Sequence, residues 1–260
     1  MRRKSLDLGS MQIRIYPTAR EAGQAAAESV AAALRELAAP RNAVGVIFAT
    51  GASQLETLRA LTSIPDLPWH KVHGFHMDEY LGISANHPAS FRRYLRENLT
   101  SRVSMAAFHE IDGSAADPEA ARFDYIDKLR AADPQICLLG IGENGHLAFN
   151  DPHEARFDDP EPMKVVTLDR ACREQQLAEA WFPSFDQVPN RALTLTIPTL
   201  LRVPRLFASV PGNRKAAIVR RALHDPISEI CPATILRTHP NLAIYLDEDS
   251  ASELDGSSVS

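Results

Sequence analysis

ICLLGIGENGHLAFNDP, residues 136–152, opens with a continuous apolar run and then places three glycines at the spacing G-x-G-x-x-G. A continuous apolar run of this length is typical of a β-strand buried on both faces, as in a parallel sheet. Glycines let the backbone approach a ligand closely, and His146 behind them is a residue type that moves protons near neutral pH. Because ligands gather at the carboxyl ends of parallel strands, the sequence predicts that this strand end forms the floor of an active site.

The glycine spacing has two other interpretations. A dinucleotide fingerprint runs from a strand directly into a helix, whereas Asn150-Asp151-Pro152 interrupts any helix soon after it begins, and no clear acidic strand end follows at the expected distance. The pattern therefore disfavours a nicotinamide or flavin site. The second alternative is a glycine turn that carries a surface histidine, and this stretch alone leaves that alternative open.

Length, composition and charge narrow the class of protein. The chain has 260 residues, 45% of them hydrophobic and 23% charged, which fits one large domain or two small ones with enough core to fold unaided. The net charge of -5 and the lack of a basic block argue against a nucleic-acid partner. The cysteines are few and scattered, which favours a reducing compartment over a disulfide framework or a zinc site. The basic residues at the start are not followed by an apolar segment, so they do not form a secretory signal. The apolar run 43–49 is too short to span a bilayer. We therefore expect a cytoplasmic protein with no membrane partner.

Strand and helix patterns alternate along the chain, which predicts an α/β fold: a single-domain, Rossmann-like parallel sheet with helices on both faces. Thr18 and Glu21 form a capping box at the start of an alanine-rich helix. We expect one domain over residues 11–247, with flexible tails at 1–10 and 248–260. Strands are predicted at 11–16, 44–49, 72–77, 136–139, 206–210 and 242–246, and extended segments at 164–168 and 192–197. Helices are predicted at 18–39, 88–98, 118–132, 169–180 and 213–223, and a further helix carries Leu55, Leu58 and Leu61.

Polar residues follow three other predicted strands. The turn Thr50-Gly51-Ala52-Ser53 offers hydroxyls and backbone N–H groups at a helix start, which suits an anion, although Ser53 as a simple N-cap is the alternative. Asp78 and Glu79 follow a strand, where a carboxylate is either a base or a cap or salt-bridge partner. Lys215 lies in the first turn of a predicted helix, where the helix dipole disfavours a cation. A phosphate bound beside it would explain a lysine at this position. The alternative is an exposed lysine with no ligand. Together these groups suit proton transfer on a phosphorylated small molecule.

Several motifs resemble the glucosamine-6-phosphate deaminase family, which is related to the 6-phosphogluconolactonases. The resemblance covers nearly the whole chain in order, and Asp78-Glu79-Tyr80 distinguishes it from the lactonases, which usually carry Asp-Glu-Arg there. The matching segments are Phe75-His76-Met77-Asp78-Glu79-Tyr80, His87-Pro88-Ala89-Ser90-Phe91, residues 142–152, Gln187-Val188-Pro189 with Ala192-Leu193-Thr194, and His239-Pro240.

The resemblance implies conversion of glucosamine 6-phosphate to fructose 6-phosphate and ammonia, with no metal or organic cofactor. It implies Asp78 as the base that moves a proton between C2 and C1, and His146 as the group that helps open the sugar ring. Asn144 and Asp151 match the positions that orient that histidine. The positions that match the phosphate site are Thr50, Gly51, Ala52, Ser53 and Lys215, and Arg173 is included as a nearby candidate.

The chain departs from the family pattern at three places. Asp151 stands where the family usually has glutamate, so its carboxylate reaches one methylene less. The lid segment 172–182 has no arginine at the family's phosphate-binding position, and Arg173 matches a different one. The serine pair of allosterically regulated hexameric members is replaced by His153-Glu154-Ala155, which predicts that the effector site is absent.

Other functions remain open at this stage. They are an isomerase or deaminase for a different sugar phosphate, a 6-phosphogluconolactonase, and a non-catalytic sugar-phosphate sensor. Asp78 favours the enzymes over the non-catalytic sensor, because a sensor needs no base at that strand end. The sequence leaves the exact sugar undefined, and it leaves open whether the chain forms a homo-oligomer.

Overall fold

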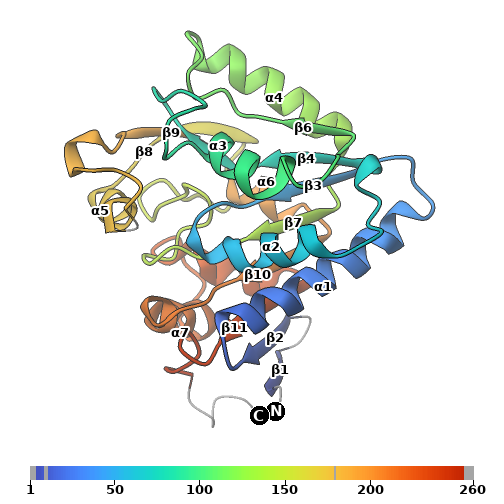
Figure 1. Ribbon diagram of the computed structural model, residues 1–260. Helices are drawn as coiled ribbons and strands as arrows, with labels where there is room; N and C mark the ends of the chain where they lie inside the picture. Colours follow the sequence, from blue (N-terminus) through green and yellow to red (C-terminus); the bar gives the residue numbers. More distant parts are fainter. Residues whose placement is uncertain (1–3, 9–10, 179, 255–260) are drawn as a thin grey trace.

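The computed structural model describes residues 4–8, 11–178 and 180–254, and a twisted sheet lies at its centre (Figure 1). Within these residues the sheet has 8 strands in the order β1-β2-β11-β10-β7-β3-β4-β6. Each pairing from β2 to β6 is parallel, and β1 runs antiparallel at the edge, so the predicted parallel sheet is confirmed. The strands are β1 (Lys4–Leu8), β2 (Met11–Tyr16), β3 (Val44–Phe48), β4 (Val72–His76), β6 (Ala107–His109), β7 (Ile136–Leu139), β10 (Arg205–Ser209) and β11 (Leu242–Asp247).

The strand order creates a crevice near the middle of the sheet. β3 and β7 are neighbours there and are buried at every residue, as their apolar sequences predicted. From β3 the chain moves to one side, to β4 and β6, and from β7 it moves to the other side, to β10 and β11. Such a reversal leaves an opening at the carboxyl ends of the strands, where ligands bind in sheets of this kind.

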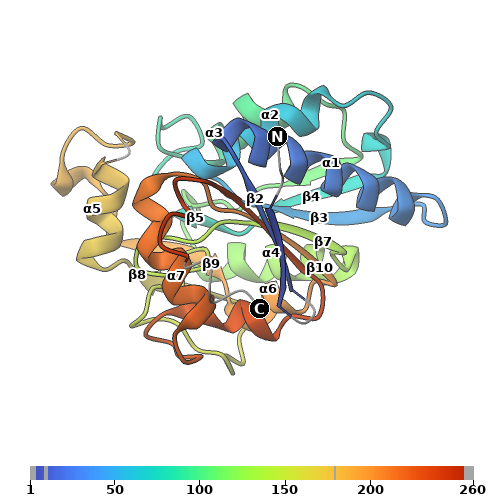
Figure 2. The same ribbon diagram turned by 90° about the horizontal axis from the view of Figure 1, so that it is seen from below.

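Helices cover both faces of the sheet, as predicted (Figure 2). One group of helices packs with β3 and β4 around one core, and another packs with β10 and β11 around a second core. At the start of α1, the Thr18 hydroxyl oxygen accepts the N–H of Glu21 at 3.2 Å, which confirms the capping box. The first group is α1 (Ala19–Ala38), α2 (Leu55–Ser63) and α3 (Phe91–Leu95), and the second is α4 (Pro118–Ala132), α6 (Ile197–Leu201) and α7 (Ala216–His224).

A small antiparallel sheet, which the sequence analysis did not predict, lies beside the main one. It consists of β5 (Asp78–Tyr80), β9 (Arg191–Leu195) and β8 (Met163–Thr167) in the order β5-β9-β8. β5 follows β4 after the single residue Met77, so one continuous segment passes from the main sheet into the small one. The small sheet and α5 (Arg170–Ala178) enclose a third core, rich in aromatic rings, and α5 projects from the body of the molecule (Figure 2).

The ends of the chain are more ordered than the sequence indicated. Lys4–Leu8 forms β1 inside the segment expected to be a flexible tail. Residues 248–254 form a turn that packs on the sheet: Ser250 is fully buried, its N–H donates to the Asp247 carboxylate at 2.8 Å, and Leu254 contacts the core. These contacts explain why the segment does not fray. The remaining tail residues, 1–3, 9–10 and 255–260, lie outside the described part of the chain. In that described part, none of the helices combines the length and apolar character needed to cross a bilayer.

Candidate active site

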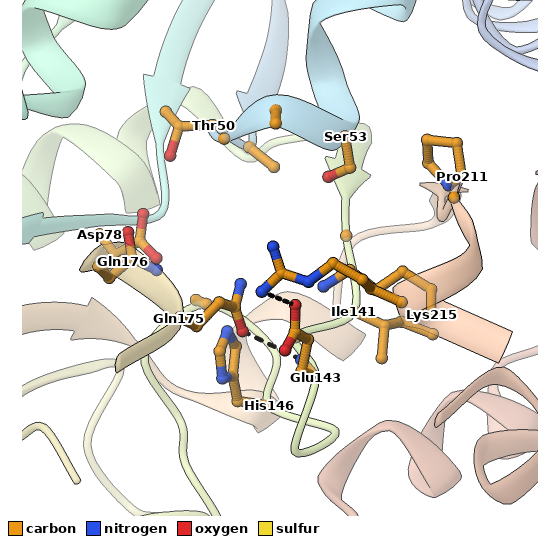
Figure 3. A pocket seen from close by; sticks show the side chains of 18 of the residues that line it. Thr50, Ser53, Asp78, Ile141, Glu143, His146, Gln175, Gln176, Pro211 and Lys215 are labelled. Atoms are coloured by element: carbon orange, nitrogen blue, oxygen red, sulfur yellow. Dashed lines mark hydrogen bonds and ion pairs between the residues drawn. The ribbon is translucent and has the colours of Figure 1, made fainter. Parts of the chain in front are cut away.

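A cavity of about 410 Å³ opens at the carboxyl ends of β3, β4, β7 and β10 (Figure 3). Its walls are residues 49–53, 77–78, 140–143 with 146, and 211–215, and α5 adds residues 175–176. Asp78 and Gln176 lie at one end of the cavity, whereas Ser53, Pro211 and Lys215 lie at the other. Segments far apart in the sequence therefore meet at the position that the sheet topology predicts.

The loop after β3 forms one wall as backbone rather than as a helix cap. Gly51 has φ 91, in the region that favours glycine. Ser53 was considered as an N-cap of α2, but it lies inside a short 3-10 turn and makes no capping hydrogen bond. Its hydroxyl faces the cavity together with Thr50 (Figure 3). The fully buried Gln54, which the sequence analysis did not single out, donates its amide to Leu139 O at 3.2 Å and ties this loop to β7.

Two cationic side chains line the cavity from the loop after β10. Lys215 lies where the sequence placed it, at the start of α7. Its neighbour Arg214, which was not predicted, makes an ion pair of 2.5 Å with Glu143 from the β7 loop. Gly212, with φ 97, turns this loop, and its N–H donates to the Asp247 carboxylate at 2.9 Å. The cations and the N–H groups of the β3 loop suit an anionic ligand at this end.

Asp78 and Glu79 have different environments because successive side chains of a strand point to opposite faces. Glu79 turns away from the cavity and accepts hydrogen bonds from the Ser90 hydroxyl at 2.7 Å and from the N–H groups of Phe91 and Arg92 at 3.3 and 3.1 Å. Glu79 thus holds the start of α3, and the interpretation of this carboxylate as a cap is confirmed.

Asp78 faces the cavity, and its buried Oδ1 atom has no hydrogen-bond partner among the described residues. Burial, and after it the negative charge of Glu79, raise the pKa of Asp78 well above its ordinary value. An ionised carboxylate without a partner and with a raised pKa is a strong base near neutral pH.

Two buried side chains that the sequence analysis did not single out hold the backbone on both sides of Met77. His76 Nδ1 bonds to the carbonyl of Asp78 at 2.9 Å, and its Nε2 accepts the N–H of Ile111 at 2.7 Å. Burial lowers the pKa of His76 to about 3, so the ring is neutral and the tautomer with hydrogen on Nδ1 fits both bonds. The Tyr125 hydroxyl donates to the carbonyl of His76 at 2.5 Å. The position of Asp78 thus rests on buried hydrogen bonds.

His146 lines the cavity floor with its ring against Asp151. Nδ1 lies 3.0 Å from Asp151 Oδ1, and Asn144 holds both residues: its amide donates to the same oxygen at 3.0 Å, and its own oxygen accepts the His146 N–H at 3.0 Å. Burial works to raise the pKa of Asp151, but the hydrogen bond and charge of His146 and the bond from Asn144 leave it below its ordinary value. A Cβ on Gly142 would lie 2.2 Å from the histidine ring, so only glycine fits there.

The structure assembles a possible donor set that the sequence spacing does not reveal. Donor atoms of His146, Asp151 and Cys172 lie within 4.8 Å of one another. Burial, and then the charges of Asp151 and Asp169, raise the pKa of the Cys172 thiol well above its ordinary value. Without a metal the thiol therefore keeps its proton beside the Asp151 carboxylate. The three side chains form one buried polar cluster behind the cavity floor.

Arg173, the nearby candidate for the phosphate site, does not line the cavity. Its side chain turns away from the cavity, donates to the carbonyls of Phe185 and Val188 at 3.0 and 2.8 Å, and lies over the Phe185 ring. Gln175 and Gln176 are the residues of α5 that face the cavity. The expected grouping therefore holds for Thr50, Gly51, Ala52, Ser53, Asp78, His146 and Lys215, while Asn144 and Asp151 lie behind His146.

Known proteins with similar sequences and folds are consistent with this arrangement. Residues 17–244 match the family described as glucosamine-6-phosphate isomerases/6-phosphogluconolactonase. A glucosamine-6-phosphate deaminase from Arthrobacter sp. (strain FB24) is 32% identical over 250 residues, which cover 94% of this chain and 93% of the relative. A solved structure of a monomeric glucosamine-6-phosphate deaminase has a TM-score of 0.85 and 31% identity, and covers 93% of this chain and 99% of its own. The 6-phosphogluconolactonase of Trypanosoma brucei, at 18% identity and a TM-score of 0.77 over 96% of this chain and 100% of its own, shares the fold. The chain belongs to the family of glucosamine-6-phosphate isomerases and 6-phosphogluconolactonases.

Proposed function

We propose that the protein converts glucosamine 6-phosphate and water to fructose 6-phosphate and ammonia. The observation that carries this proposal is the buried carboxylate of Asp78, which faces the cavity without a protein partner. A binding protein has no use for such a group, because leaving it unpaired costs stability. The deaminases to which the chain is similar support the choice of reaction.

Ring opening is the first task, and His146 is suited to it. Nδ1 lies against the Asp151 carboxylate at 3.0 Å, which leaves the Nε2 edge toward Gly142 and the cavity. His146 would move a proton between the C1 hydroxyl and the ring oxygen, which breaks the C1–O5 bond and yields the open-chain aldehyde. Asp151 and Asn144 act through the histidine as positioning residues.

Asp78 would then carry the proton that turns the aldose into a ketose derivative. The C2–H bond breaks, the proton passes to Asp78, and its electron pair forms a C1–C2 double bond while the carbonyl π electrons move to O1. Return of the proton to C1, with the nitrogen lone pair forming the C2–N double bond and one proton passing from nitrogen to O1, gives the C2 imine. Addition of water to C2 then releases ammonia and leaves fructose 6-phosphate.

The phosphate would occupy the far end of the cavity. There the N–H groups of residues 50–53 and the side chains of Lys215 and Arg214 are donors from two loops. Anchoring the phosphate at that end directs C1 and C2 toward Asp78, and binding energy away from the reacting atoms holds them in place. We also infer that residues 11–247 form one catalytic domain and that it acts in the cytoplasm, where the scattered, buried cysteines stay reduced.

The test is ammonia release from glucosamine, galactosamine and mannosamine 6-phosphates, with hydrolysis of 6-phosphogluconolactone measured alongside. We expect release from glucosamine 6-phosphate and a loss of at least about 100-fold in kcat for Asp78→Asn, the scale of a general base. Asp127→Asn, at an exposed position of α4, is the matched control. Lactone hydrolysis without ammonia release, or full turnover by Asp78→Asn, would overturn the proposal.

A further inference from the structure

β5 directs two side chains to the same side, because residues two apart in a strand share a face. These are Asp78 and Tyr80, while Glu79 between them points the other way. The Tyr80 ring is fully buried among Phe91, Phe149 and Phe182, with ring centres 5.1 to 5.4 Å away. Its position is therefore fixed by packing.

The Tyr80 hydroxyl donates to Oε1 of Gln176 on α5 at 2.7 Å. Because an amide is planar, this bond also sets the direction of its NH₂ group. Gln176 is only 6% exposed, lines the cavity and lies beside Asp78 (Figure 3). Within the described residues its Nε2 donates to no protein acceptor, not even the buried Oδ1 of Asp78. This donor lies on a side chain that lines the cavity next to the base, so a ligand in the cavity can supply its acceptor.

The proposed reaction needs a donor at this place. When a base removes a proton beside a carbonyl, negative charge develops on the carbonyl oxygen, and fixed donors aimed at that oxygen stabilise the transition state. Arg214 is paired with Glu143, and Lys215 lies at the opposite end of the cavity from Asp78. Among the described residues that line the cavity, Gln176 places an amide donor beside Asp78.

We propose that Gln176 is a catalytic residue whose Nε2 donates a hydrogen bond to O1 of the open-chain substrate and stabilises the enolate formed when Asp78 takes the C2 proton. This inference rests on the proposed function. As the C2–H electron pair becomes the C1–C2 double bond, the carbonyl π pair moves to O1, where the amide hydrogen meets it. Tyr80 is the positioning residue that holds the amide in this orientation.

A neutral donor suits this place better than a cation. A lysine or arginine beside Asp78 would favour the ionised carboxylate and make it a weaker base. An amide stabilises charge on O1 without adding a full positive charge next to Asp78. Gln176 therefore assists the oxygen while the basicity of Asp78 is preserved.

The first test compares three variants on glucosamine 6-phosphate. Gln176→Met keeps the length of the side chain but removes the donor, and Gln176→Glu keeps an acceptor for Tyr80 while replacing the NH₂ group. We expect each to lose about 100-fold or more in kcat, with KM changed less than about threefold. Tyr80→Phe frees the amide to rotate, and we expect a loss of about tenfold in kcat. Gln24→Met, on the exposed side of α1, is the matched control.

The second test measures binding and needs no turnover. A five-carbon hydroxamate phosphate mimics the planar enolate, and the amino alditol phosphate made by reducing C1 mimics the substrate without a carbonyl. Gln176→Met should weaken binding of the hydroxamate at least tenfold and leave that of the alditol nearly unchanged. Unchanged kcat, or equal weakening for both compounds, would overturn the role of Gln176. Failure of the wild-type enzyme to release ammonia would overturn the proposed function itself.

Discussion

Asp78 and Glu79 are adjacent buried carboxylates, and their different partners divide their tasks. Glu79 accepts several hydrogen bonds and stabilises α3, whereas Asp78 has an oxygen without a partner. Burial raises the pKa of both side chains. Asp78 lacks the hydrogen bonds that offset this effect at Glu79, so ionising Asp78 costs the folded state free energy.

This cost gives a stability prediction for Asp78→Asn. The pKa of Asp78 is higher in the folded protein than in the unfolded chain. At a pH between these two pKa values, the unfolded chain has lost the Asp78 proton while the folded protein still holds it. Wild-type stability therefore falls as pH rises through this window. The variant lacks this loss, and we expect its Tm to exceed that of the wild type by about 2 °C or more at pH 8, a shift on the scale of 1 kcal/mol.

Calorimetry at pH 4 and pH 8 provides the measurement. The increase in Tm of Asp78→Asn over the wild type should be smaller at pH 4, because the Asp78 carboxyl is then protonated in the folded wild type and resembles the amide. Asp127→Asn, at its exposed position, should change Tm by less than about 1 °C at either pH. An equal increase in Tm at pH 4 and pH 8 would mean that ionisation of Asp78 does not cause the difference in stability.

At the scale of elements, β9 supports both halves of the candidate chemistry. It pairs with β5, which carries Asp78, through Thr194, Leu193 and Ala192. The Thr194 hydroxyl also accepts the N–H of Phe149 at 3.0 Å, and the carbonyl of Leu195 accepts the amide of Asn150 at 2.9 Å. The loop that bears the histidine thus depends on the same strand as the base.

The loops after β7 and β10 are joined by the ion pair of Glu143 and Arg214. A phosphate in the cavity would compete with Glu143 for the guanidinium group, which prefers bidentate anions. We expect Arg214→Gln to raise KM for glucosamine 6-phosphate about tenfold with kcat within about twofold, the scale of one charged hydrogen bond. Glu143→Gln should lower KM severalfold, because it removes the competing carboxylate.

Arg220→Gln is the control, since Arg220 is a half-exposed residue of α7 paired with Glu253. Steady-state kinetics at fixed ionic strength gives the answer. A KM that stays constant in Arg214→Gln would exclude a phosphate contact by this residue. A rise in KM for Glu143→Gln would mean that the pair supports the site rather than competing with the ligand.

The sequence was sufficient to predict the helices and strands that have strong local patterns. The continuous apolar runs of β3 and β7 and the alternation of β2 led to the parallel sheet, and the polar residues after the strands led to the cavity. β5 has three residues and no periodicity, and its pairing with β9 is a long-range contact, so the small sheet was missed. The roles of Gln54, His76 and Tyr125 likewise depend on partners distant in sequence.

The position of Arg173 around the axis of α5 explains why its side chain does not face the cavity. Cys172 and Gln176 are four residues apart in α5 and share its buried face. Arg173, one residue after Cys172, is rotated by about 100° and reaches the segment 185–188 instead. Its place near the family's lid arginine suggested a phosphate contact, but the position of α5 on the small sheet decides where its side chain points.

At the scale of the whole molecule, we expect no activation by N-acetylglucosamine 6-phosphate. Where related hexameric enzymes carry a serine pair, His153 bonds to the carbonyl of Thr167 at 2.8 Å, and Glu154 accepts the N–H of Thr167 at 3.0 Å. These side chains support β8 and offer a carboxylate that repels a phosphate.

Rate against substrate concentration should be hyperbolic, with the same KM in the presence and absence of that compound. Initial rates over a wide substrate range, repeated at several protein concentrations, provide the measurement. A sigmoidal curve that N-acetylglucosamine 6-phosphate makes hyperbolic would reveal an effector site elsewhere on the surface.

The dependence of β5 on β9 has a consequence for the nascent chain. On the ribosome, β3 and β4 emerge early and can pair with each other, but Gln54 of the loop after β3 gains its partner on β7 only when Leu139 has been translated. The strand that carries Asp78 must wait until residues 191–195 have been translated. A polypeptide released before that point would hold the loop after β3 but neither a positioned base nor Arg214 and Lys215 from the loop after β10, so ligand recognition and catalysis are both completed late in translation.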